Sequence, residues 1–317
     1  MEQRTLGRSG LRVPKLTFGG NVFGWTVDRP TSFSMLDALL DHGLNFIDTA
    51  DEYSRWAAGN RGGESETLIG DWLKHSGNRD RVILATKVGM PMGEGKKGLS
   101  AAYIRQAVTD SLRRLQTDYI DLYQAHTDDA SVCLEETLNA FDALIREGKV
   151  RVIGASNYSG VRLAEALRIS EQNGLARYES LQPEFNLYDR RKFEQDLQPV
   201  VSAHGIGVIN YYALASGFLS GKYRAPEDAG KSARGATVIE RYLTARGLQV
   251  LQALDAISEA YRVTPAQIAL AWQMRHPAIT APIASATSLT QLAELAQATR
   301  ITLSDEDYQL LDEASAD

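Results

Sequence analysis

Four polar residues have the types and the spacing that acid–base chemistry requires. Asp48 and Lys87 each end a short apolar run, His126 directly follows a third run, and Tyr53 lies five residues after Asp48. Charges at the ends of apolar runs are partly desolvated, so Asp48 and Lys87 are expected to pair. An ammonium favours a phenolate, so Lys87 should lower the pKa of Tyr53 from about 10. We therefore expect Tyr53 to donate a proton and His126 to orient a carbonyl oxygen.

Each of these residues also has a structural interpretation when it is taken alone. Asp48 could cap the loop that follows it, and Tyr53 could be an aromatic residue at the rim of the fold. His126 could be an interior histidine with satisfied hydrogen bonds. Their shared position at the ends of successive apolar runs favours the catalytic interpretation.

Short apolar runs that alternate with amphipathic segments are expected to position these residues. The runs predict eight strands, at residues 16–18, 45–48, 82–87, 120–125, 150–155, 180–182, 207–211 and 280–283. Mostly apolar runs are typical of parallel strands that are covered on both faces. Eight such strands, each followed by a helical pattern, favour an α/β fold that is a single (β/α)8 TIM barrel over residues 1–317.

Two further features accompany the predicted barrel. A β-hairpin is expected at the N-terminus around the turn at residues 7–10, and long loops at 54–63 and 213–236 are expected on the C-terminal face of the barrel. The alternative is a doubly wound sheet, which normally carries G-x-G-x-x-G after its first strand. Residues 18–21 do not supply that motif.

Composition excludes several classes of protein. The chain has 317 residues, of which 44% are hydrophobic and 23% are charged, and its formal net charge is −6. Its basic residues form no long run, so we expect no nucleic-acid partner. The single cysteine, Cys133, allows no intrachain disulfide. The N-terminus lacks a signal-peptide layout, and the chain lacks an apolar run of about 18 residues. We therefore expect a cytoplasmic protein with no membrane partner, and composition leaves its oligomeric state open.

Six motifs carry a resemblance to a known family. They read DTADEY, ATK, DYIDLYQAH, GASN, QPEFN and GFLSGKY, at residues 48–53, 85–87, 118–126, 154–157, 182–186 and 217–223. In this order, over essentially the whole chain, they resemble the aldo-keto reductase superfamily. The resemblance implies NAD(P)H-dependent reduction of an aldehyde or ketone, or the reverse oxidation of an alcohol. It assigns the catalytic roles to Asp48, Tyr53, Lys87 and His126.

The resemblance also implies a nicotinamide cofactor that lies across the barrel mouth. Its expected binding residues are Gly20, Asn21, Asp48, Ser156, Asn157, Gln182, Tyr211, Leu214, Lys222, Arg234, Ser285, Thr287, Gln291 and Glu294. Ser156, Asn157 and Gln182 match the residues that hold the carboxamide, and Tyr211 matches the aromatic that stacks on the nicotinamide ring. Ser156 and Asn157 could also cap the following helix, and the two roles are compatible.

Departures from the family pattern bear on which cofactor is bound. Ser285 replaces the usual glycine, Leu295 replaces an asparagine that would contact adenine, and Gln291 stands where some relatives have an arginine for the 2′-phosphate. NADPH is the expected cofactor and NADH remains compatible. Lys231 or Arg234 in the long loop could supply a charge to the phosphate.

The substrate is expected to be a small carbonyl compound or alcohol. Its pocket is expected to include Tyr53 and His126, with walls formed by Trp25 and Trp56 in loops at the mouth, although both tryptophans could be ordinary surface anchors.

Two other functions remain as alternatives. One is a cofactor-binding regulatory subunit with weak reductase activity, similar to potassium-channel β subunits. The other is a metal-dependent barrel hydrolase, which would need several His and Asp ligands at strand ends, where only His126 and Asp48 are available. We therefore expect no metal.

Overall fold

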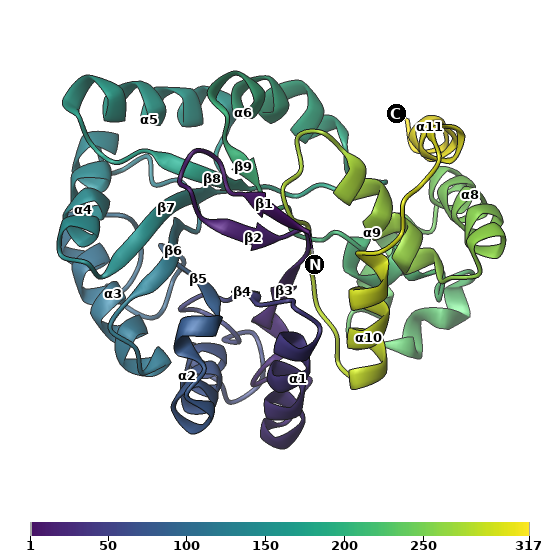
Figure 1. Ribbon diagram of the computed structural model, residues 1–317, viewed down its shortest axis with the longest axis horizontal. Coiled ribbons are helices and arrows are strands. Elements are labelled where there is room, and N and C mark those ends of the chain that lie inside the picture. The colour runs from purple at the N-terminus through teal and green to yellow at the C-terminus, as the bar shows by residue number, and fades with distance from the viewer. Residues whose placement is uncertain (1, 317) are drawn as a thin grey trace.

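Eight parallel strands form one sheet that curls around a central axis in a computed structural model that describes residues 2–316 (Figure 1). They are β3 (Thr17–Gly19), β4 (Phe46–Asp48), β5 (Ile83–Val88), β6 (Ile120–Ala125), β7 (Val150–Ser156), β8 (Tyr178–Gln182), β9 (Gly207–Val208) and β10 (Ile283–Ala284). Hydrogen bonds from Thr280 and Ala281 to Val208 O join the two ends of the sheet. The expected α/β fold is confirmed, and its eight-stranded parallel sheet is consistent with a (β/α)8 barrel. Residues 1 and 317 of the predicted domain lie outside the described residues.

Helices surround the sheet (Figure 1). They are α1 (Arg29–Asp41), α2 (Glu64–Ser76), α3 (Ala101–Leu115), α4 (Leu134–Arg146), α5 (Gly160–Asn173), α6 (Gln198–His204), α7 (Gly235–Tyr242), α8 (Ala245–Tyr261), α9 (Pro265–Arg275), α10 (Leu289–Ala298) and α11 (Asp305–Ala314). Their ends follow local sequence signals: Ser100 caps α3, and Thr264 and Gln267 form a capping box at α9. Among residues 2–316, none of the helices is long and apolar enough to cross a membrane.

Two strands are shorter than the sequence predicts by at least two residues, and proline explains both differences. The strand expected at 207–211 ends at Val208, and the strand expected at 280–283 begins only at Ile283. Pro183 follows β8 and Pro282 precedes β10, and a proline has no N–H to donate to a sheet ladder. Each proline therefore contributes only its carbonyl oxygen. Pro183 O accepts from Tyr211 N, and Pro282 O accepts from Thr17 N.

The N-terminal strands β1 (Gln3–Thr5) and β2 (Arg12–Pro14) pair as an antiparallel hairpin. Figure 1 shows this hairpin lying across one end of the barrel. Leu6 and Val13 are fully buried there and pack with inward-facing residues such as Phe46, which begins its strand. The N-terminal end of the barrel is therefore filled by apolar side chains, which leaves the opposite end for polar ones.

Candidate active site

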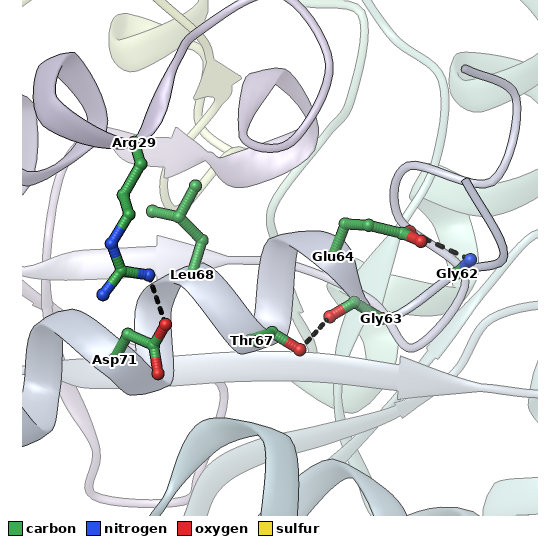
Figure 2. Close-up of a pocket in the computed structure, with 7 residues that line it drawn as sticks. All are labelled: Arg29, Gly62, Gly63, Glu64, Thr67, Leu68 and Asp71. Atoms are coloured by element: carbon green, nitrogen blue, oxygen red, sulfur yellow. Dashed lines mark hydrogen bonds and ion pairs between the residues drawn. The ribbon is translucent and has the colours of Figure 1, made fainter. Parts of the chain in front are cut away.

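A surface pocket near the start of α2 does not contain the expected catalytic residues (Figure 2). It is lined by Arg29, Gly62, Gly63, Glu64, Thr67, Leu68 and Asp71. Its charged side chains already have partners, since Arg29 pairs with Asp71 and the Glu64 carboxylate accepts from Gly62 N at 2.9 Å. The expected catalytic residues lie instead at or just after the ends of the strands.

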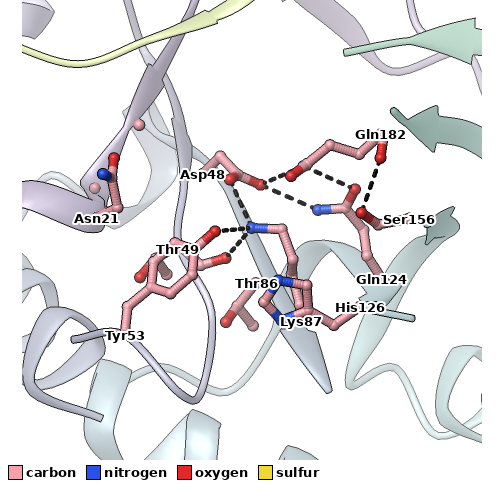
Figure 3. Close-up of polar contacts among 12 residues, drawn as sticks. Asn21, Asp48, Thr49, Tyr53, Thr86, Lys87, Gln124, His126, Ser156 and Gln182 are labelled. Carbon is pink, nitrogen blue, oxygen red and sulfur yellow. Dashed lines mark hydrogen bonds and ion pairs between the residues drawn. The ribbon is translucent and has the colours of Figure 1, made fainter. Parts of the chain in front are cut away.

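The alternation of the strands brings polar side chains together at the C-terminal end of the barrel (Figure 3). Residues two apart on a strand face the same side. On β5 and β6, the apolar residues Ala85 and Leu122 pair with each other and belong to the inner core. Two residues further along each strand, Lys87 and Gln124 also pair with each other. Asp48 pairs with Ala85 from the neighbouring strand β4. Apolar residues thus support a polar layer above them. We call this layer, together with Tyr53, His126 and Gln182, the strand-end floor of the mouth.

Lys87 is the centre of this layer and is fully buried. Its ammonium donates to Asp48 Oδ2 at 2.7 Å, to Thr49 O at 2.8 Å and to Tyr53 Oη at 3.1 Å, which uses all three of its donors. Burial alone would lower the pKa of Lys87, but the charge of Asp48 and the contact with Tyr53 outweigh it and raise that pKa. Lys87 is therefore a charged donor at neutral pH.

The Tyr53 hydroxyl lies beside Lys87, as the sequence predicts, but its pKa moves in the other direction. Burial raises the pKa of Tyr53, the Lys87 ammonium lowers it by less, and the Asp48 carboxylate adds to the increase. The expected lowering of this pKa is therefore wrong, because the sequence shows the ammonium but not the desolvation. The hydroxyl stays protonated at neutral pH, which is the form a proton donor needs.

His126 lies next to Tyr53, with ring centroids 5.9 Å apart, and is only 7% exposed. Burial, and then the charge of Lys87, hold the pKa of His126 well below its ordinary value, so the imidazole is neutral. Its Nδ1 is buried and has no hydrogen-bond partner among the described residues, and Glu52 Oε1 lies 3.9 Å away. A neutral imidazole thus lies beside the Tyr53 ring.

Gln124 is a member of this cluster that sequence reasoning missed. Its Nε2 donates to Asp48 Oδ1 at 3.1 Å, and its Oε1 accepts from Gln182 Nε2 at 3.2 Å. Gln182 also donates to Asp48 Oδ1, at 2.9 Å. The signal was present in the sequence, because Gln124 precedes His126 by two residues and therefore shares its face of the strand.

Three expected cofactor-binding residues adjoin this cluster. Ser156 Oγ donates to Gln182 O at 2.8 Å, and Asn157 Nδ2 donates to His126 O at 2.9 Å. Tyr211 Oη donates to Asn157 Oδ1 at 2.8 Å, so Tyr211, which lies three residues after β9, also contacts this cluster. Asn157 has a φ of 56°, a left-handed conformation that asparagine tolerates better than most residues.

Aromatic side chains form a wall on the other side of Tyr53. The Trp56 ring lies 5.3 Å from the Tyr53 ring, and the Trp25 ring lies 5.7 Å from that of Trp56. Trp56 is 47% exposed. The Arg234 guanidinium lies 5.6 Å from the Trp25 ring, so the long segment contacts this wall.

The residues expected at the adenosine end gather near the N-terminus of α10. Ser285 Oγ lies within hydrogen-bond distance of Gly19 O, at 2.8 Å, and of Asn21 Oδ1, at 2.6 Å, on either side of Gly20, and its single O–H can donate to either oxygen. Gln291 Oε1 accepts from Thr287 N at 2.9 Å and from Thr287 Oγ1 at 3.1 Å.

Further along α10, Glu294 contributes a backbone contact: its carbonyl oxygen accepts from Gln267 at 3.0 Å. Leu295 is buried in the core, which gives this departure from the family pattern a structural role.

The long segment carries the remaining candidates. Leu214 O accepts from Gly217 N at 2.8 Å, which closes the turn before Lys222, an exposed residue. Lys231 donates to Lys222 O at 2.7 Å and pairs with Asp228 at 2.7 Å. Lys231 is thus neutralised by a neighbour. Within residues 2–316, no group of three or more His, Cys, Asp or Glu is arranged to hold a metal ion.

Comparison with known proteins shows which family this chain belongs to. A profile described as "Aldo/keto reductase family" matches residues 15–316. The chain is 35% identical to "Uncharacterized oxidoreductase YrpG" of Bacillus subtilis over 99% of this chain and 95% of that protein. It is 34% identical to "Probable voltage-gated potassium channel subunit beta" of Arabidopsis thaliana, with 93% and 90% covered, and 32% identical to "Protein tas" of Escherichia coli, with 96% and 95% covered.

Proposed function

Because the chain belongs to the aldo/keto reductase family, we propose that it reduces an aldehyde or ketone to an alcohol with a nicotinamide cofactor, or catalyses the reverse oxidation. The observation that carries the proposal is the contact from the buried Lys87 ammonium to Tyr53 Oη, 3.1 Å long, beside a neutral imidazole. Few structural roles require a buried cation, a phenol and a histidine at one strand-end cluster.

The proton chemistry follows from these contacts. Lys87 donates to Tyr53 Oη, so the tyrosine O–H proton is left to donate to a substrate oxygen. The raised pKa of Tyr53 keeps that proton in place until negative charge develops on the oxygen. The ammonium then stabilises the phenolate that forms, and Asp48 holds the ammonium in position at 2.7 Å. Neutral His126 can donate one N–H to the same oxygen.

The residues at the mouth fit a nicotinamide dinucleotide. When bound in its reduced form, this cofactor supplies a hydride to the carbonyl carbon. The donor set suits it: a hydroxyl and amides at Ser156, Asn157 and Gln182 for the carboxamide, and the Tyr211 ring for a stacked face. The α10 N-terminus, with hydroxyls at its start, is the kind of site that binds phosphate.

The preferred cofactor in this proposal is NADPH, with NADH also bound. Gln291 uses its Oε1 to accept from Thr287, so its Nε2 is the group that can donate to a 2′-phosphate. Neutral donors are weaker than charged ones, so the preference should be modest. Arg234 and Lys222 are the cations of the long segment proposed to act on the cofactor phosphates.

The regulatory alternative predicts the same binding but slow turnover. Relatives of the chain are named as potassium-channel β subunits, and that name describes those proteins. Nothing in the geometry of this site favours a regulatory role over catalysis.

Cofactor titration followed by a substrate panel tests the proposal. Fluorescence titration with NADPH and NADH should show binding of both. Incubation with a panel of aldehydes and ketones should then give steady oxidation of NADPH at many turnovers per site. A chain that binds neither dinucleotide would contradict the proposal, and binding followed by a single slow turnover would favour the regulatory alternative.

A further inference from the structure

Two buried glutamines and one carboxylate form a closed set of hydrogen bonds below the mouth (Figure 3). Gln124 is fully buried on β6, and Gln182 is 2% exposed on β8. Both donate from Nε2 to Asp48 Oδ1, at 3.1 and 2.9 Å, and Gln182 Nε2 also donates to Gln124 Oε1 at 3.2 Å. The three side chains come from strands far apart in the sequence, so this set exists only in the closed barrel.

The Asp48–Lys87 ion pair decides which way both amides face. A carboxylate only accepts hydrogen bonds, so each amide must turn its N–H groups toward Asp48. Gln124 then presents Oε1 to its neighbour Gln182. Gln182 uses Nε2 for both of its contacts, and this leaves Oε1 as the acceptor of that amide.

A glycine provides the room for this arrangement. Gly154 on β7 lies in register between Gln124 and Ser180. A Cβ at this position would lie 3.3 Å from Gln124 Cγ and 2.1 Å from Ser180 Oγ. A larger residue at 154 would therefore push against the side chain that spans from β6 toward Gln182.

We propose that Gln124 is a positioning residue that holds the Gln182 amide with its oxygen as acceptor, so that the site selects a pyridine ring carrying a carboxamide over one carrying a carboxylate. The inference rests on the proposed function, in which Gln182 holds the carboxamide. A carboxamide can donate an N–H to Gln182 Oε1. A carboxylate would bring only acceptor oxygens and a negative charge close to Oε1 and to Asp48.

Three ligands separate this role from general cofactor binding. They are NADP⁺, its nicotinic-acid analogue, and 2′-phospho-ADP-ribose, which has no pyridine ring. For the wild-type chain, calorimetry should give at least about tenfold tighter binding of NADP⁺ than of the analogue. In Gln124→Met this ratio should fall to within about threefold, while binding of 2′-phospho-ADP-ribose stays unchanged.

Gln124→Glu provides a conservative rescue with its own pH signature. The introduced carboxyl can, when protonated, donate to Asp48 and accept from Gln182, as glutamine does, whereas the ionised form can only accept. The ionisable groups around this position are Asp48 of β4, Lys87 of β5 and His126, which directly follows β6. Burial next to a carboxylate raises the pKa of a glutamate side chain. The variant should therefore keep the wild-type ratio at low pH and lose it as pH rises, whereas Gln124→Met shows no such change.

Ser180→Ala is the matched control. Its hydroxyl is buried at the level of Gly154 and has no hydrogen-bond partner among the described residues. This variant should keep the wild-type ratio, and thermal melting should show that all variants fold. The inference would be overturned if folded Gln124→Met kept the wild-type ratio of affinities for NADP⁺ and the analogue. It would also be overturned if this ratio were the same in Gln124→Glu and Gln124→Met at every pH. Failure of the wild-type chain to bind any dinucleotide would instead overturn the proposed function.

Discussion

The strand-end floor and the α10 end of the mouth both present an oriented glutamine, but they orient it by different means. In the floor, Gln182 donates to the buried Asp48 carboxylate, which is itself held by Lys87. At the α10 end, Gln291 accepts from the backbone N–H and hydroxyl of Thr287, and this pair lies at the exposed surface. Buried charges interact strongly and exposed neutral groups weakly. We therefore expect the floor to control the chemical step and the α10 end to adjust cofactor choice.

Removing the cation of the floor should have the largest effect. Lys87→Met leaves Asp48 without its charged partner and removes the donor to Tyr53. We expect kcat/KM for carbonyl reduction to fall by about 10³-fold or more, and stability to fall by about 3–5 kcal/mol. Stopped-flow rates and urea unfolding measure the two effects. Lys149→Met, at a lysine on the surface, is the control, and normal rates in folded Lys87→Met would contradict the mechanism.

Removing one hydroxyl from the same floor should affect the rate but hardly the binding. Tyr53→Phe keeps the ring against Trp56 and deletes the proposed proton donor. The rate of the chemical step should fall by about 10²-fold or more while the dissociation constant for NADPH changes little. Single-turnover kinetics with fluorescence titration separate the two quantities. A variant with near-normal turnover would assign the proton to another residue.

A positive charge added at the α10 end should increase the preference for NADPH over NADH. Gln291→Arg replaces a neutral donor with a guanidinium that can contact a phosphate through two bonds. We expect the preference for NADPH over NADH to rise by about tenfold with turnover on NADPH unchanged. Gln291→Leu, which has no donor, is the control and should lower the preference. An unchanged preference in Gln291→Arg would place the 2′-phosphate away from α10.

A charge removed from the long segment should have a smaller effect. Arg234 is exposed and lies over the Trp25 ring, so Arg234→Gln should weaken NADPH binding by only about threefold at low salt. The loss should shrink as ionic strength rises, because salt screens exposed charges. Lys231→Gln is the matched control, since Lys231 is paired with Asp228. Equal effects of the two substitutions would argue against a specific role for Arg234.

The smallest expected change is the response of the floor to pH. The raised pKa of Tyr53 keeps its hydroxyl protonated up to pH values above 10, and the lowered pKa of His126 keeps its ring neutral down to values well below 6.5. Neither group changes charge in between, so kcat/KM for reduction should be flat from about pH 6.5 to 10. Below this window, stability should fall, because the unfolded chain takes up a proton on His126 that the folded chain resists. A rise or fall of kcat/KM near pH 8 would mean that the ionisation of another group controls the reduction.

The sequence by itself determined the elements and the place of the candidate catalytic residues. Apolar runs ending in Asp48 and Lys87 are local patterns, and eight repeats of a strand and a helix leave few ways to cover a parallel sheet on both faces. Even the missed Gln124 follows from strand alternation, since it shares a face with His126.

Only the tertiary structure decided the properties that depend on distant neighbours. The pKa of Tyr53 rises because burial outweighs the ammonium beside it, and burial is set by side chains from several strands. The amide of Gln182 faces Asp48 across 134 positions of sequence, and Arg234 lies over the Trp25 ring although the two residues are far apart in the chain. Desolvation and hydrogen-bond direction are fixed by three-dimensional proximity, which residue types and spacing do not encode.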